Sequence, residues 1–369
     1  MSTILTSAMK QWMTRPADQR FQSLEEVRAA VASGHGRTYE SSDTPFSSLR
    51  VEVQPNDALA LVGTKRIPAM MTHWSFGQVC TAAQAPASFL RTLKPTLAAN
   101  VLNSKLAELY PTDDAKANLL VEAAPDAAGS EPTFFLRGAT TDSYTRIWNL
   151  PIVESLIRLQ QNNPCWQPAP SAFDGSRGLY AGPQDMFLFL VDNDRRIFES
   201  DPNGGLSRGF FVQNSEVGAG SFKIVLFFYE RICGNHRVIG AQGIREINYK
   251  HIGKADERAF KALGATLQTY ATESAANDEA VLGATKQKQI AADRETLIEE
   301  VYAMKLPGVT KQLVEASYTK AVEREAWYGN PLSFWGFTGG MTEIARDLPH
   351  ANERTQIDRA AGKILQMAF

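Results

Sequence analysis

The nine residues FKIVLFFYE, at positions 222–230, form the longest aromatic and β-branched run in this chain of 369 residues. Both alternating sets of positions are apolar over most of the run, with Lys223 as an early exception. A strand that is apolar on both faces is typical of the centre of a sheet that is covered on both sides. The run therefore predicts a central strand of the main sheet.

Further strands are predicted on either side of this run. Residues 186–191 are continuously apolar before Asp192, and residues 209–213 follow a turn at Gly204 and Gly205. Shorter runs at 49–53 and 59–62 also predict strands, and segments 133–137 and 144–148 predict a hairpin.

Helical patterns alternate with these strands. Apolar residues recur at three-and-four spacing over residues 97–109, behind Pro95 at a first-turn position. Further helices are predicted at 24–32 and 151–159. Residues 256–324 are rich in Ala, Glu, Gln and Lys, with a break at Pro307-Gly308.

These patterns predict an α+β fold: a central, mostly antiparallel sheet flanked by helices, with a long helical region toward the C-terminus. The expected organisation is an N-terminal arm at residues 1–45, an α+β core domain at 46–255, and a helical region at 256–369 that packs on the core.

Composition excludes several classes of protein. With 44% hydrophobic and 21% charged residues, the chain can bury a large core. A formal net charge of −2 excludes a whole-surface polycation, so any affinity for nucleic acid must come from a local cluster of Lys and Arg. No run approaches the roughly 18 apolar residues of a membrane helix. We therefore expect no membrane partner and a cytoplasmic location, in the host cytoplasm if a phage encodes the chain.

Signatures of catalysis and of cofactors are absent from the sequence. The three cysteines lack CxxC spacing and are interpreted as buried small apolar residues, while the five histidines form no HExxH pair. Neither Gly204-Gly205 nor Gly339-Gly340 stands in a phosphate-binding frame, and there is no GxSxG motif. The prediction is a protein that is not an enzyme and holds no cofactor or metal.

One alternative keeps a catalytic role open. Asp192, Asp194 and Glu199 follow a predicted strand, where two-metal nucleases keep their ligands. The intervening Arg195 and Arg196, and the following turn, suit a solvated loop equally well.

The most informative stretch is residues 208–254, where seven cations face three glutamates. Aromatic residues are interleaved with these cations, a mixture that can neutralise phosphates and stack bases. The alternative is that the aromatics belong to the core and the cations to a solvated rim. The candidate phosphate-contacting residues are Arg208, Arg231, Arg237, Arg245 and Lys250, and the candidate stacking residues are Tyr229 and Tyr249.

Several blocks of the sequence resemble the DUF932 family of phage and plasmid proteins. The resemblance is carried by GFFVQNSEVG at 209–218 and YERICGN at 229–235, and by FLRTLKP at 89–95, SYTRIWN at 143–149, GNPLSFW at 329–335 and AAGKIL at 360–365. It spans roughly residues 51–369 and implies a mobile-element origin, with an association with replication or recombination genes. It supplies no catalytic residues. Within the motif, Gly218 permits a backbone turn, and Ser215 and Glu216 can cap or bridge neighbouring backbone.

Two functional hypotheses follow. The first is a non-enzymatic, phage-type protein that binds single-stranded DNA or RNA, as an annealing or replication accessory. The second is a homo-oligomeric structural or host-interaction protein, in which the helices of residues 256–324 and the aromatic loop at 327–337 make contacts with other subunits or with host proteins.

Overall fold

A computed structural model gives the structure of the chain. It describes residues 16–64, 66–124, 133–169, 177–198, 205–230, 237–239, 247–272, 276–347, 357, 360–365 and 367–368. The fold is α+β, as predicted, with antiparallel pairing in nearly every strand pair.

The larger sheet has eight strands within the described residues, all paired antiparallel. Its order is β1-β9-β10-β11-β12-β13, with β8 paired to β10 and β14 to β12. The strands are β1 (Arg20–Phe21), β8 (Trp166–Pro168), β9 (Leu179–Ala181), β10 (Met186–Ile197), β11 (Leu206–Asn214), β12 (Phe222–Glu230), β13 (Arg237–Ile239) and β14 (Ile247–Tyr249). The predicted central strand, β12, lies between β11 on one side and β13 and β14 on the other.

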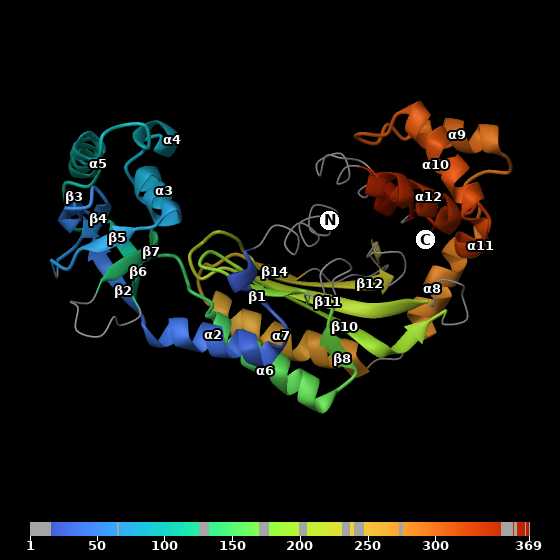
Figure 1. Cartoon of the computed structure of the whole chain (residues 1–369), viewed down its shortest axis with the longest axis horizontal. Helices are drawn as coiled ribbons and strands as arrows, with labels where there is room; N and C mark the ends of the chain where they lie inside the picture. The colour runs from blue at the N-terminus through green and yellow to red at the C-terminus, as the bar shows by residue number, and fades with distance from the viewer. Residues whose placement is uncertain are drawn as a thin grey trace.

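One face of this sheet packs on three helices (Figure 1): α2 (Leu24–Gly36), α6 (Asn149–Asn162) and α7 (Ala255–Thr272). Alternate residues of β12, among them Phe222 and Ile224, enter this core and are fully buried. α2 begins at the cap Ser23, whose hydroxyl accepts a hydrogen bond from the backbone N–H of Glu26.

A second, six-stranded sheet forms a separate unit with its own core. Its order is β2-β6-β7-β5-β4-β3, and β5 with β7 is its parallel pair. The strands are β2 (Thr38–Pro45), β3 (Arg50–Val53), β4 (Leu59–Val62), β5 (Ala69–Met71), β6 (Lys116–Ala123) and β7 (Phe134–Thr141). The covering helices are α3 (His73–Ala82), α4 (Ala87–Leu90) and α5 (Pro95–Leu109).

The C-terminal part is helical. It contains α8 (Ala276–Gln287), α9 (Arg294–Ala303), α10 (Lys311–Glu323), α11 (Glu325–Tyr328) and α12 (Phe334–Asp347). A Cβ atom on Gly340 would collide with the Ser317 carbonyl oxygen and lie 2.7 Å from the Ala321 nitrogen, so this glycine lets α12 approach α10. Gly340 is therefore a helix-packing feature.

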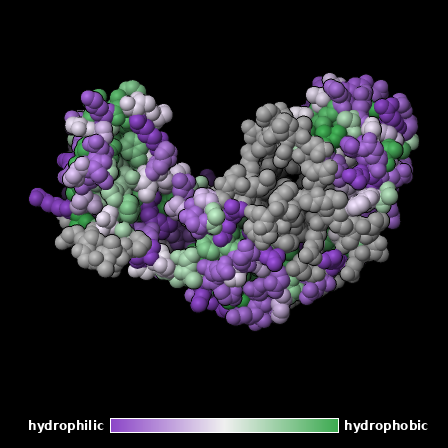
Figure 2. All heavy atoms as spheres, viewed as in Figure 1, coloured by the Kyte–Doolittle hydropathy of each residue, from purple (hydrophilic) through white to green (hydrophobic). Residues whose placement is uncertain are grey.

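A small apolar cluster attaches these helices to the far end of β10 and β11. Ile197 and Leu206 of the sheet pack with Leu282, Trp335 and Leu365. Figure 1 shows the six-stranded unit and the C-terminal helices at opposite ends of the larger sheet, rising on the same side of it. The space-filling view in Figure 2 shows the same concave outline.

Several segments differ from the sequence-based expectations. Residues 17–45, expected as an arm, contribute β1, α2 and β2 to the two sheets, and the expected core at 46–255 contains strands of both sheets. Segment 144–148 forms only an isolated bridge, Tyr144 to Ile252. β10 continues past Asp192 to Ile197 through a bulge, because its polar end still finds partners along β11.

Within the described ranges, no helix is long and apolar enough to cross a membrane.

Candidate nucleic-acid interface

The structure describes only some of the seven predicted contact residues. Arg231 and Arg245 lie outside the described residues. The backbones of Tyr229 and Arg237 lie in the paired strands β12 and β13, where Glu230 stands opposite Arg237, but their side chains are outside the described part.

Arg208 points into the core, contrary to the prediction of a phosphate contact. Its side chain shares a face of β11 with the buried Phe210, the residue is 3% exposed, and the guanidinium carbon lies 3.9 Å from the ring centre of Tyr270 on α7. Alternation along β11 places residue 208 on the helix-covered face. This cation is thus part of the packing between the sheet and α7.

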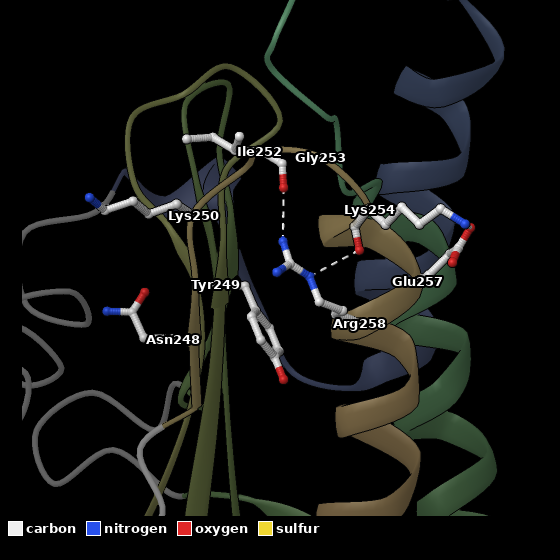
Figure 3. Close-up of a pocket in the computed structure, with 8 residues that line it drawn as sticks. All are labelled: Asn248, Tyr249, Lys250, Ile252, Gly253, Lys254, Glu257 and Arg258. Carbon is white, nitrogen blue, oxygen red and sulfur yellow. Dashed lines mark hydrogen bonds and ion pairs between the residues drawn. The ribbon is translucent and has the colours of Figure 1, made fainter.

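Tyr249 and Lys250 are both among the residues that line one pocket, of about 570 Å³, at the junction of β14 and α7, although their side chains point to opposite sides (Figure 3). Gly253 turns the chain there with a φ of 63°, in the left-handed region that glycine adopts readily. α7 then starts two residues later. The lining residues are Asn248, Tyr249, Lys250, Ile252, Gly253, Lys254, Glu257 and Arg258.

Arg258 holds the loop of this pocket in place. Its Nη2 donates to the Ile252 carbonyl at 2.8 Å and its Nε donates to the Lys254 carbonyl at 3.2 Å. The guanidinium carbon is 5.5 Å from the ring centre of Tyr249, a cation–π distance. Arg258 nevertheless remains exposed, so an anion can reach it.

Tyr249 does not offer the free ring that base stacking requires. The ring is half-buried, packs against the core of the larger sheet and lies parallel to Phe222 with centroids 6.5 Å apart. Arg258 lies over it on the pocket side (Figure 3). In this structure Tyr249 is a wall of the pocket that positions Arg258.

Two other cations lie on the opposite face of β14 from Tyr249. Asn248 and Lys250 point to that side in Figure 3, and Lys223 of β12 stands directly opposite Asn248 in the strand register. Within the described part, no carboxylate lies within 4 Å of Lys223, Lys250 or Arg258. Lys254, in contrast, pairs with Glu257 at 3.5 Å. Among the described residues, cations without a carboxylate partner therefore flank the loop of residues 250–254 on both sides.

This loop is also tied to the segment that enters α6. The Thr145 N–H donates to the His251 carbonyl at 2.9 Å, and the His251 Nδ1 lies 3.1 Å from the Thr145 carbonyl. The His251 ring is 5% exposed and stacks on Tyr144 at 4.9 Å. Burial lowers the pKa of His251, and the nearby Arg146 lowers it further, while the hydrogen bond to Thr145 opposes both effects.

The motif Ser215-Glu216-Val217-Gly218 has a structural role in the fold. Gly218 has a φ of 78°, and the Ser215 hydroxyl accepts from the Ala219 N–H at 2.9 Å and donates to the Gln184 carbonyl at 2.6 Å. The predictions of a glycine turn and of a capping serine are confirmed. The Val217 carbonyl accepts from Trp74 and Gln78 of α3, which join this turn to the six-stranded unit.

Glu216 is the buried anion of this junction. Its carboxylate accepts from the Asn149 N–H at 2.9 Å and lies 3.3 Å from Arg137 Nη2, and its backbone carbonyl accepts from Arg146. Arg146 also pairs with Glu40 at 3.2 Å. These contacts connect β7 and β2 with the turn after β11, so the most recognisable motif joins the two sheets.

The two candidate carboxylates that the structure describes, Asp192 and Asp194, do not face a common site. Asp192 is fully buried in β10, whereas Asp194 is exposed and donates its backbone N–H to the Asp192 carboxylate at 3.2 Å. Glu199 lies outside the described residues. No group of three potential ligands occurs in the part of the chain that the structure covers.

Sequence reasoning missed a second basic surface, on the six-stranded unit. Residues 58–107 contain five Lys or Arg and no Asp or Glu. On α4 and the start of α5, Phe89 is 57% and Leu97 51% exposed. A count of acidic residues in a sliding window is the signal that identifies this stretch.

Comparisons of the chain with models of protein families, with curated proteins and with solved structures find no match. The resemblance to the DUF932 family therefore stays a prediction.

Proposed function

We propose that this chain is a non-enzymatic protein that binds single-stranded nucleic acid, with the loop of residues 250–254 as a phosphate-contacting site. The observation that carries the proposal is a set of cations around that loop that have no carboxylate within 4 Å among the described residues: Lys223, Lys250 and Arg258. Cations that keep their charge uncompensated are available to replace the counterions condensed on phosphates.

The geometry favours backbone contacts at this pocket. Arg258 presents a planar guanidinium that two backbone carbonyls hold in a fixed direction, which suits a bidentate contact to phosphate. Ile252, 55% exposed at the rim, supplies apolar surface for a base. A role as an annealing or replication accessory rests on the resemblance alone and is part of the same proposal.

A matched pair of variants tests this proposal. In fluorescence anisotropy with labelled single-stranded and duplex DNA, Lys250→Ala/Arg258→Ala should weaken single-strand binding about tenfold or more, since each lost phosphate contact removes counterion release. Arg294→Ala/Lys320→Ala makes the same change in charge at ion-paired positions on α9 and α10 and should bind as the unaltered chain does. Equal affinities for both variants would refute the site.

The oligomeric alternative has less support in this structure. Trp335 and Phe337, expected in an aromatic loop, lie in α12, are 2% and 0% exposed and pack inside the chain's own cores. They offer no surface to another subunit in this conformation. Light scattering on the intact chain measures the oligomeric state directly and is independent of the binding assay.

A further inference from the structure

The connection between α4 and α5 combines exposed apolar side chains with exposed cations. Phe89 and Leu97 are each more than half exposed, at 57% and 51%. Arg91 and Lys94 lie between them in the chain, and both are exposed. A large aromatic ring at this level of exposure contributes little to the core of its own unit.

Negative charge is absent from this part of the chain. Residues 58–107 contain no Asp or Glu, and in the part that the structure describes no carboxylate lies within 4 Å of Arg91 or Lys94. Along the chain, the next carboxylate is Glu108 at the other end of α5, roughly 20 Å from Lys94 along the helix axis. Glu108 is already paired with Lys105 at 2.9 Å. The positive charge of this surface is thus uncompensated.

The surface is held in shape from below. Leu90 is 2% exposed and anchors α4 in the core of the six-stranded unit. Arg91 donates from Nη2 to the His73 carbonyl at 2.9 Å, and its guanidinium lies 5.2 Å from the ring centre of Phe76. The Thr92 hydroxyl donates to the Phe89 carbonyl at 2.7 Å. A ligand therefore meets a preorganised arrangement and loses less entropy on binding.

We propose that this α4–α5 surface is a second contact for single-stranded nucleic acid, in which Arg91 and Lys94 contact phosphates and Phe89 stacks a base. The proposal rests on the proposed function. Cations beside an exposed aromatic ring are the combination that single-strand binding proteins use without sequence preference. Exposed hydroxyl and amide groups accompany the cations and can donate hydrogen bonds to phosphate oxygens: Ser88, Thr96 and Asn100.

The two contacts have different chemical characters. The pocket at residues 250–254 presents a covered tyrosine, whereas Phe89 presents an open ring face. Base stacking is therefore assigned to α4–α5 and electrostatic contact to both sites. This division predicts that substitutions at the two sites affect affinity separately.

The test uses the full chain and oligo-dT. Phe89→Ala/Lys94→Ala should weaken binding about 5- to 160-fold, because one stacked base is worth about 1–3 kcal/mol. The matched control is Tyr302→Ala/Lys311→Ala, which removes an exposed aromatic ring and an exposed lysine from α9 and the start of α10. Photo-crosslinking to an oligonucleotide that carries 5-bromodeoxyuridine should label the peptide of residues 67–91, and Phe89→Ala should abolish that label.

The outcomes separate this proposal from the proposed function. If Phe89→Ala/Lys94→Ala binds as the control does while Lys250→Ala/Arg258→Ala is weakened, the α4–α5 contact is refuted and the pocket stands. The converse result refutes the pocket and keeps α4–α5. Poly-glutamate tests for an acidic polypeptide as the ligand. If it binds the unaltered chain as tightly as oligo-dT does, and binds Phe89→Ala/Lys94→Ala more weakly, the surface belongs to an acidic polypeptide and the proposal is overturned.

Discussion

The Arg137 guanidinium on β7 lies 3.3 Å from the buried carboxylate of Glu216, in the turn that follows β11. This ion pair connects the six-stranded sheet to the eight-stranded sheet. The same carboxylate accepts the Asn149 N–H at the start of α6, so three elements depend on one anion.

Glu216→Ala should destabilise the chain by about 1–3 kcal/mol, because it leaves the buried Asn149 N–H without its acceptor and removes one of the two carboxylates that Arg137 contacts, Glu122 at 3.4 Å being the other. The free energy of unfolding in urea measures the effect. Glu52→Ala, at an exposed position of β3, should change it by no more than about 0.5 kcal/mol. Equal stabilities for the two variants would show that the junction contributes nothing.

Gly340→Ala should destabilise the C-terminal helices by about 1–3 kcal/mol or more, because the added methyl group collides with the backbone of α10. Gly264→Ala provides the matched control. No atom lies within 4 Å of the Cβ position there, and in the interior of α7 alanine should stabilise by about 0.5–1 kcal/mol. Thermal unfolding of both variants checks the opposite signs.

Stability should fall as the pH drops below 6.5, partly because of His251. Burial lowers the pKa of this imidazole in the folded chain, so below the ordinary value of 6.5 the unfolded chain binds more protons than the folded one. Neutral His251 makes its full contribution to stability above pH 6.5. That contribution is lost as the pH falls from 6.5 through the lower pKa of the folded chain. His251→Asn, which retains a donor for the Thr145 carbonyl, should reduce the difference in urea midpoint between pH 7.5 and pH 5.5. An unchanged difference would exclude His251 as a source.

Cys80 should resist alkylation in the folded chain. It is fully buried in α3, and burial raises the pKa of its thiol to about 11, so little thiolate forms at pH 8. Iodoacetamide labelling followed by mass spectrometry should modify Cys80 only in denaturant. The half-buried Cys165 serves as the internal comparison.

Much of the fold can be predicted from local patterns. The apolar runs identified β10, β11 and β12, and Pro307-Gly308 correctly separated α9 from α10. Pro95 stands at the start of α5, as its fixed φ favours. These features depend on residues that are close together in the sequence, so the sequence of one chain is enough to predict them.

The division into two sheets depends on contacts between distant segments. β2 pairs with β6, and β5 pairs in parallel with β7, across more than sixty positions of sequence. Strand patterns do not specify such partners. The segment predicted as an arm, residues 1–45, therefore contributes a strand to each sheet, β1 and β2.

Two of the seven predicted contact residues, Tyr249 and Lys250, line the candidate pocket. Lys250 lines the pocket, whereas Arg208 points into the core. Alternation along a strand assigns residues to two faces of the sheet, but it does not tell which face the helices cover. The cover over Tyr249 comes from Arg258, nine residues later on another element. Arg258 lies four residues past the basic stretch at residues 208–254, so that stretch does not include it.

The most direct test of the proposed function is the salt dependence of binding to single-stranded DNA, measured by anisotropy for the unaltered chain and for Lys250→Ala/Arg258→Ala. If both cations contact phosphates, the slope of log K against log salt should become shallower by about 1.4, since each contact on a single strand contributes about 0.7. Identical slopes and affinities for the two proteins would contradict the proposed phosphate contacts.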